Sequence, residues 1–209
     1  LTIYPDGAMG GEAEMVRRMR VGQLQAGLLS AVGLTTLEPA VAGLQTIPMM
    51  FRSLEEVDFI GAELQPMLEK RLREKGFVVL GWVDAGWVHF FSKQPVVRPA
   101  DLKRLKLFTW AGDARAFDLY RSAGFNPVSL ETGDILPGLQ TGLIEAVPMP
   151  PFVALTGQVD GSASHMLELN WAPLAGALVV AAKTWEALPP ATQEVLMAAA
   201  RDASSQIKA

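Results

Sequence analysis

The chain has no cysteine among its 209 residues, which excludes disulfides, zinc–thiolate sites and thiol nucleophiles together. Its two histidines, His89 and His165, stand alone without metal-ligand spacing, so we interpret each as a structural residue. No apolar run reaches the ~20 residues that span a bilayer. No basic run occurs and the net charge is −4, which argues against nucleic acid or an anionic membrane surface as a partner. We therefore expect neither a metal nor a cofactor.

A short repeat is the most informative feature that the sequence does contain. Gly-Gln-Leu-Gln-Ala at residues 22–26 matches Gly-Leu-Ile-Glu-Ala at residues 142–146, and each copy separates an expected helix from an apolar run. Glycine suits the left-handed turn after a helix, and an apolar run suits a buried strand. Because half of the residues are hydrophobic, a substantial core is expected. The repeat predicts two similar lobes with a cleft between them.

Hydrophobic periodicity and turn residues predict the remaining elements. Expected helices cover residues 12–21, 53–75, 113–123, 133–141 and 189–207. Expected strands cover residues 1–4, 24–32, 77–82, 88–92, 105–110, 127–128, 143–149 and 176–182. Ser53 and Glu56 form a capping box at the start of the long helix. The alternation predicts an α/β fold with two lobes and mixed sheets, joined by crossing hinge strands in residues 77–92 and 147–158.

Catalytic motifs are lacking. There is no Gly-x-Ser-x-Gly and no His-Glu-x-x-His, and the glycine-rich residues 7–11 lack the spacing and lysine of a phosphate loop. An enzyme would have to use Asp84 and His89, which nothing arranges as an acid–base pair, so we expect a protein without catalytic residues. Trp87 and Trp110 lie near expected strand ends, where an aromatic ring either packs in a core or lines a cleft.

The order of several motifs resembles one known family. Residues 5–12 resemble Pro-x-x-x-Leu-Gly-x-Glu, with Met9 in the leucine position. Residues 99–106 resemble Pro-x-Asp-Leu-Lys-Gly-Leu-Lys, and residues 139–145 resemble Leu-Gln-Thr-Gly-x-x-Asp. Residues 47–51 and 185–189 resemble two further segments, a Leu-Pro-aromatic motif and the start of a late helix. Together they resemble the extracytoplasmic solute-binding proteins of TRAP transporters, the DctP-type family.

The resemblance implies a periplasmic, or lipid-anchored extracytoplasmic, receptor whose two α/β lobes close on a small-molecule ligand. The receptor would deliver that ligand to TRAP membrane permease subunits, with an auxiliary periplasmic protein as a further conceivable partner. Residues 1–86 are expected to form mostly lobe 1 and residues 87–150 mostly lobe 2, with residues 151–209 crossing back. The family's first strand and helix have no counterpart here, and its C-terminal region stops early, so we expect the chain to be part of a longer protein.

The departures from the family concern polar contacts. Phe108 stands where the family places the arginine that grips a ligand carboxylate, Val88 falls on a second basic position, and Pro148-Met149 replaces a polar pair. Apolar walls would leave a carboxylate without hydrogen bonds, and they would favour an apolar ligand. We therefore expect an apolar cleft that binds a hydrophobic or amphipathic ligand. The residues expected to line it are Phe108, Trp110, Val88, Trp87 and Met149, with Ser30 and Trp171 also placed there by alignment.

Two alternatives stay open. Arg115, early in the helix after Phe108, could replace the missing arginine in a conventional organic-acid receptor. The same fold could also serve as the ligand-binding sensory domain of a signalling system.

Overall fold

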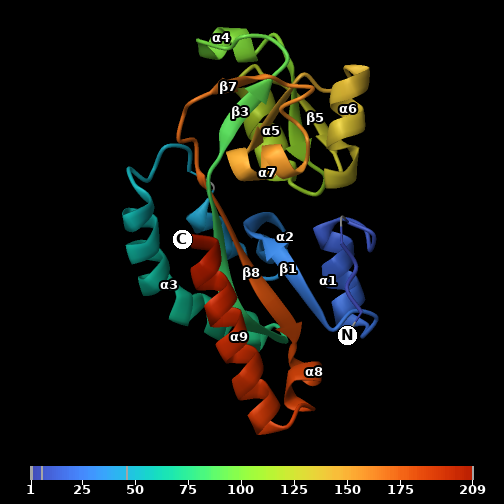
Figure 1. Cartoon of the computed structure of the whole chain (residues 1–209), viewed down its shortest axis with the longest axis vertical. Coiled ribbons are helices and arrows are strands. Elements are labelled where there is room, and N and C mark those ends of the chain that lie inside the picture. The colour runs from blue at the N-terminus through green and yellow to red at the C-terminus, as the bar shows by residue number, and fades with distance from the viewer. Residues whose placement is uncertain (1, 6, 46, 209) are drawn as a thin grey trace. The chain divides into compact units, whose positions relative to one another are not determined.

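The computed structural model describes residues 2–5, 7–45 and 47–208. The chain divides into two compact units: unit 1 comprises Leu1–Gly11 and Trp87–Trp171, and unit 2 comprises Glu12–Gly86 and Ala172–Ala209. The chain therefore passes from one unit to the other after Gly11, Gly86 and Trp171. Figure 1 shows the course of the chain through its helices and strands. The predicted α/β fold with mixed sheets is confirmed.

Unit 2 is built on a sheet with the strand order β1-β8-β2, in which β1 and β8 run antiparallel. Its elements are α1 (Glu12–Arg20), β1 (Ala26–Ser30), α2 (Ala31–Thr35), η1 (Pro39–Leu44), α3 (Leu54–Glu74), β2 (Phe77–Trp87), β8 (Pro173–Ala181), α8 (Ala182–Glu186) and α9 (Pro190–Lys208). The last residue of β2 already belongs to unit 1. The helix α9 lies alongside β8 and β2 (Figure 1), and Ala200 of α9 packs with Val78, Leu80 and Val180 of these strands.

Unit 1 is built on a mixed sheet with the strand order β5-β4-β6-β3-β7. Its elements are β3 (His89–Ser92), α4 (Pro99–Leu102), β4 (Lys106–Trp110), α5 (Ala114–Ser122), β5 (Asn126–Leu130), η2 (Thr132–Asp134), α6 (Ile135–Thr141), β6 (Ala146–Met149), α7 (Pro151–Thr156) and β7 (His165–Leu167). The strand β4 is parallel to β5 and β6, whereas β3 is antiparallel to β6 and β7.

The sheet of unit 1 has a separate apolar layer on each face, because side chains alternate along a strand. Phe91, Phe108, Val147 and Met149 share one face, where they pack with residues of α6 and α7. Phe90, Leu107 and Ala146 share the other face, where they pack with Leu102 of α4 and with Tyr120 of α5. Both faces of β3, β4 and β6 are therefore buried, which explains why these strands read as nearly continuous apolar runs.

The repeated motif has the predicted structure in both copies, and one copy lies in each unit. Gly22 follows α1 with a φ of 77°, and Gly142 caps α6 with a φ of 74°. Both values lie in the left-handed region, where a side chain is strained. The motif then leads into β1 in unit 2 and into β6 in unit 1. Lys93 and Lys106 donate from their Nζ atoms to the carbonyls of Leu139 and Gly142, which satisfies the end of α6.

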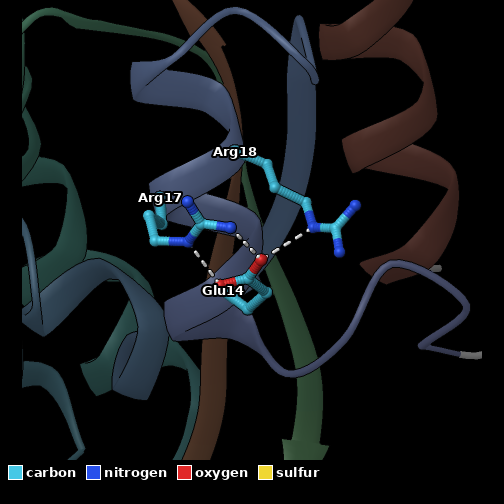
Figure 2. Close-up of polar contacts among 3 residues, drawn as sticks. All are labelled: Glu14, Arg17 and Arg18. Carbon is cyan, nitrogen blue, oxygen red and sulfur yellow. Dashed lines mark hydrogen bonds and ion pairs between the residues drawn. The ribbon is translucent and has the colours of Figure 1, made fainter.

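Polar and charged side chains form hydrogen bonds on α1 and at the start of α3. On α1 the Glu14 carboxylate accepts hydrogen bonds from Arg17 at 2.6 and 2.7 Å and from Arg18 at 2.9 Å (Figure 2). The hydrogen bond from Arg17, helped by that from Arg18, lowers the pKa of Glu14 to about 2. The predicted N-cap is present at α3, where the Ser53 hydroxyl accepts from the backbone N–H of Glu56. The Glu56 carboxylate accepts from the backbone N–H of Arg52 and not from that of Ser53, so the bond differs from the reciprocal bond of the predicted capping box.

Some predicted elements differ from the structure. Thr2–Tyr4 form no strand, and Leu1 lies outside the described residues. The segment 77–87 is one long strand, five residues longer than the predicted 77–82, and Gly86 near its end takes a φ of 84° that suits glycine. The apolar run that follows Gly22 is divided between β1 and α2, since Ser30 caps a helix there. The short elements α7 and β7 were not predicted at all.

No helix among the described residues has the length and apolar character needed to cross a membrane.

Candidate functional site

The strands β4, β5 and β6 of unit 1 run in the same direction, so their carboxyl ends lie at one edge of the sheet. They end at Trp110, Leu130 and Met149, and the antiparallel β3 begins beside Met149 with His89. We call these four residues the carboxyl edge of unit 1. Open α/β sheets bind ligands at this kind of edge, because the loops that follow the strands converge there. The carboxyl edge is therefore the candidate site.

Phe108 precedes Trp110 by two residues on β4 and belongs to the core. Its side chain is 0% exposed, and it packs with Ile135 and Leu139 of α6. Its ring centroid lies 5.0 Å from that of Trp110 in an edge-to-face arrangement, the geometry that aromatic pairs prefer. Met149 is buried in the same cluster. The structure thus shows Phe108 and Met149 as packing residues, and their contact with a ligand stays a prediction.

Val88, which directly precedes β3, is hydrogen-bonded to Trp171 through the backbone. The backbone N–H of Trp171 donates to the carbonyl of Val88 at 3.1 Å, and the side chain of Val88 is buried. The Trp171 ring packs edge-on against Phe90 at 5.2 Å and stacks on Tyr120 at 6.3 Å. Burial raises the pKa of Tyr120 to about 12, although a hydrogen bond with Trp171 opposes the shift. Trp87 is half-buried and is the first residue of the second segment of unit 1. Ligand contacts of these three predicted residues stay predictions.

Ser30 belongs to unit 2, whereas the other predicted site residues belong to unit 1. Its hydroxyl donates to Oε2 of Glu12 at 2.7 Å and accepts from the backbone N–H of Val32. The Glu12 carboxylate also accepts from the backbone N–H groups of Ser30 and Gly33, both at 2.8 Å. Ser30 therefore serves as the N-cap of α2 in a network around Glu12. A ligand contact of Ser30 stays a prediction.

Two polar atoms near the carboxyl edge have no hydrogen-bond partner among the described residues. They are Nδ1 of His89, whose side chain is 9% exposed, and Oγ1 of Thr109, which precedes Trp110 in β4. By the strand registers His89 shares the face of Met149 and Phe91, whereas Thr109 lies on the opposite face. A lone histidine on a strand predicts a structural residue, and this interpretation of His89 stays a prediction; its unpaired nitrogen has no signal in the sequence.

Arg115 lies beyond the same edge, in the first turn of α5. The turn that follows β4 ends at Asp113, whose Oδ1 accepts from the backbone N–H of Ala116 and caps this helix. The side chain of Arg115 is exposed, and it makes no ion pair within residues 2–5, 7–45 and 47–208. Within the same ranges no three acidic or histidine side chains are grouped as a metal site would require. Arg115, five residues after Trp110 in the chain, is thus a positive charge without an ion pair in the part of the chain that the structure describes.

Comparison with known proteins identifies relatives over the whole chain. Residues 1–209 match the family described as bacterial extracellular solute-binding protein, family 7. The 2,3-diketo-L-gulonate-binding periplasmic protein of Escherichia coli K12 is 26% identical over 208 residues, which cover 98% of this chain and 62% of that protein. The chain therefore spans about three-fifths of the length of the curated relatives that it matches.

Solved structures share the fold. A TRAP periplasmic solute-binding protein from Xanthobacter autotrophicus Py2 with bound β-D-galacturonate has a TM-score of 0.91 at 18% identity, covering 99% of this chain and 69% of that one. Another, from Sulfurospirillum deleyianum DSM 6946 with bound succinate, has a TM-score of 0.89 at 21% identity, covering 99% and 66%. Each of these solved proteins holds an acid, and the hydrophobic ligand predicted from the sequence finds no support among them.

Proposed function

Since the chain belongs to the family-7 bacterial extracellular solute-binding proteins, we propose that it is the solute receptor of a TRAP-type transporter and that its solute carries a carboxylate. Such a receptor would work in the periplasm and deliver its solute to membrane permease subunits. The observation that carries the proposal is the family match over residues 1–209. Support for an acid comes from the relatives, which hold or are named for β-D-galacturonate, succinate and 2,3-diketo-L-gulonate.

A hydrophobic solute is not part of this proposal. It was inferred from apolar residues in positions where the family has polar ones, and two of these residues, Phe108 and Met149, pack in one core cluster of unit 1. Side chains that fill a core give no information about the polarity of a ligand. A phenylalanine at position 108 is therefore explained by packing and does not indicate an apolar cleft.

We assign the counter-charge for the carboxylate to Arg115. A carboxylate needs a donor that stays charged, and a guanidinium offers two parallel N–H groups to its two oxygens. Arg115 is exposed beside the carboxyl edge and has no ion pair among the described residues. The N–H groups at the start of α5 add a favourable dipole for an anion near the same turn.

Isothermal titration of the purified full-length protein with β-D-galacturonate, 2,3-diketo-L-gulonate and succinate tests the proposal. Succinamide, which has the shape of succinate without its charge, serves as the control ligand. We expect at least one acid to bind and succinamide not to bind. Binding of none of the three acids, or equal binding of succinamide and succinate, would refute a carboxylate receptor of this type.

The role of Arg115 has a matched control on its own helix. Arg121 is also exposed on α5, where it lies near Asp118 at 3.5 Å and over the ring of Phe117. Arg115→Gln should raise the Kd of the bound acid about tenfold or more, the effect of losing a hydrogen bond to a charged group. Arg121→Gln makes the same change in net charge and should leave the Kd unchanged. Equal Kd values for both variants would show that another group supplies the counter-charge.

A further inference from the structure

We propose that His89 contacts the solute and that its imidazole donates a hydrogen bond to the solute's carboxylate, an inference that rests on the proposed function. The relatives' ligands and the family match do not point to this residue. It follows from the burial of His89, its unpaired nitrogen and its place in the sheet of unit 1.

The first argument is the unpaired nitrogen. His89 is 9% exposed, and its Nδ1 is buried without a hydrogen-bond partner among the described residues. Buried side-chain polar atoms are nearly always paired, so each exception needs an explanation. An unpaired polar atom destabilises the fold, whereas a phenylalanine would fill similar space without leaving one. The unpaired Nδ1 is explained if a bound ligand forms the missing hydrogen bond with His89.

The second argument is position. His89 opens β3 directly opposite Met149, which closes β6. Of the other members of the carboxyl edge, Leu130 and Met149 are apolar and Trp110 offers only its indole N–H, so His89 is the most polar side chain of the four. Few well-placed polar groups within an apolar lining are typical of small-molecule sites, where they fix the orientation of the ligand. His89 also lies only three residues after Gly86, where the chain enters unit 1.

The third argument is chemistry. The imidazole can present an N–H group whether it is neutral or protonated, so it can donate to a carboxylate oxygen in either state. Low polarity around a hydrogen bond strengthens it, and here the neighbours on the same face are Met149 and Phe91. The two roles are then distinct: Arg115 supplies charge from the exposed start of α5, and His89 supplies a short-range donor from the sheet itself.

The experiment compares two variants of His89 in the full-length protein, with the acid that binds wild type in the titration above. His89→Phe removes the donor and keeps an aromatic ring, and His89→Gln keeps a donor on a different scaffold. The control is His165→Gln, since His165 is exposed on β7 of the same sheet. We expect His89→Phe to raise the Kd about tenfold or more, His89→Gln to raise it less, and His165→Gln to leave it unchanged.

Thermal unfolding separates this role from a structural one. His89→Phe removes an unpaired polar atom, so without ligand its Tm should equal or exceed that of wild type. A loss of affinity without a loss of Tm supports the proposal, and Kd values within twofold of wild type for both variants overturn it. If His89→Phe does not fold, His89→Gln decides by the same Kd criterion.

Imidazole NMR of the wild type gives a test without mutation at the site. Of the signals of His89 and His165, those of His89 should shift when the acid is added, and those of His165 should not. Unshifted His89 signals at saturating acid would overturn the proposal. If wild type binds no acid, the proposed function fails and this inference fails with it. Normal binding with unaffected His89 variants defeats only the inference.

Discussion

Replacement of Phe108 decides whether the residue in the family's arginine position is part of the core. Phe108 is 0% exposed, packs with α6 residues and lies 5.0 Å from Trp110 in an edge-to-face pair. Truncation of a buried phenylalanine to alanine costs about 3–5 kcal/mol of unfolding free energy, and an aromatic pair contributes about 0.5–1.5 kcal/mol of this. Phe108→Ala should therefore destabilise unit 1 by about 3–5 kcal/mol.

Phe108→Arg distinguishes the core interpretation from a ligand-facing one still more sharply. A side chain that faced the ligand would accept arginine and improve the binding of small carboxylates. A core position would instead bury an unpaired charge, which costs about 3–5 kcal/mol or more. We expect Phe108→Arg to unfold unit 1 at a lower urea concentration than any other variant named here.

Urea unfolding should be followed with amide hydrogen exchange in β4 and β6, because a chain with two units need not unfold in one step. The matched control is Phe152→Ala in the same unit, since Phe152 on α7 is 70% exposed. That variant should change the unfolding free energy by less than about 0.5 kcal/mol. A loss below about 1 kcal/mol for Phe108→Ala, or a stable Phe108→Arg with tighter acid binding, would refute the core interpretation.

Three further predictions concern the scaffold. Glu12→Gln should lower the unfolding free energy of unit 2 by about 2 kcal/mol in urea, because its carboxylate accepts from three donors at the start of α2; unchanged stability would contradict this network. Gly176→Ala should lower the unfolding free energy of unit 2 by about 1–3 kcal/mol, since the added Cβ would lie 2.6 Å from the carbonyl oxygen of Leu29. A Tm equal to that of wild type would show that β1 moves away from the added methyl group without loss of stability. The Glu14 carboxyl, whose pKa the Arg17 hydrogen bond lowers from 4.5 to about 2, contributes stability above pH 4.5 that is lost as the pH falls towards 2. NMR titration should find it ionised at pH 3.5, and a midpoint near 4.5 would disprove the contact.

Local signals in the sequence were sufficient for most of the fold. The repeat glycines, Gly22 and Gly142, require left-handed backbone, and helical periodicity followed by an apolar run leaves few alternatives around them. The capping box at Ser53 predicted the start of α3 for the same reason. What failed depends on tertiary context. The short β7 gains its hydrogen bonds only from β3, and a strand of this kind has no periodicity of its own.

The site was harder to predict because position along a strand does not tell which neighbours a side chain meets. Alignment predicts Ser30 in the cleft, which stays a prediction; in the structure its hydroxyl is hydrogen-bonded to Glu12 and to the start of α2. A hydroxyl that caps a helix and a hydroxyl that binds a ligand look the same in sequence. Conversely, the unpaired nitrogen of His89 is visible only once burial and hydrogen bonds are known.

The sequence predicts an apolar ligand from three positions, Phe108, Val88 and Pro148-Met149. In the structure Phe108 and Met149 pack in one cluster, and Val88 is buried beside β3. Side chains in contact change together, since a charge at one position would be left unpaired among apolar neighbours. Phe108 and Met149 therefore count as one feature of the packing. If the solute carries a carboxylate, as we propose, groups other than the side chain at position 108 bind it, because Phe108 has no donor. We propose Arg115 and His89 for this role, because among the described residues Arg115 makes no ion pair and Nδ1 of His89 has no hydrogen-bond partner.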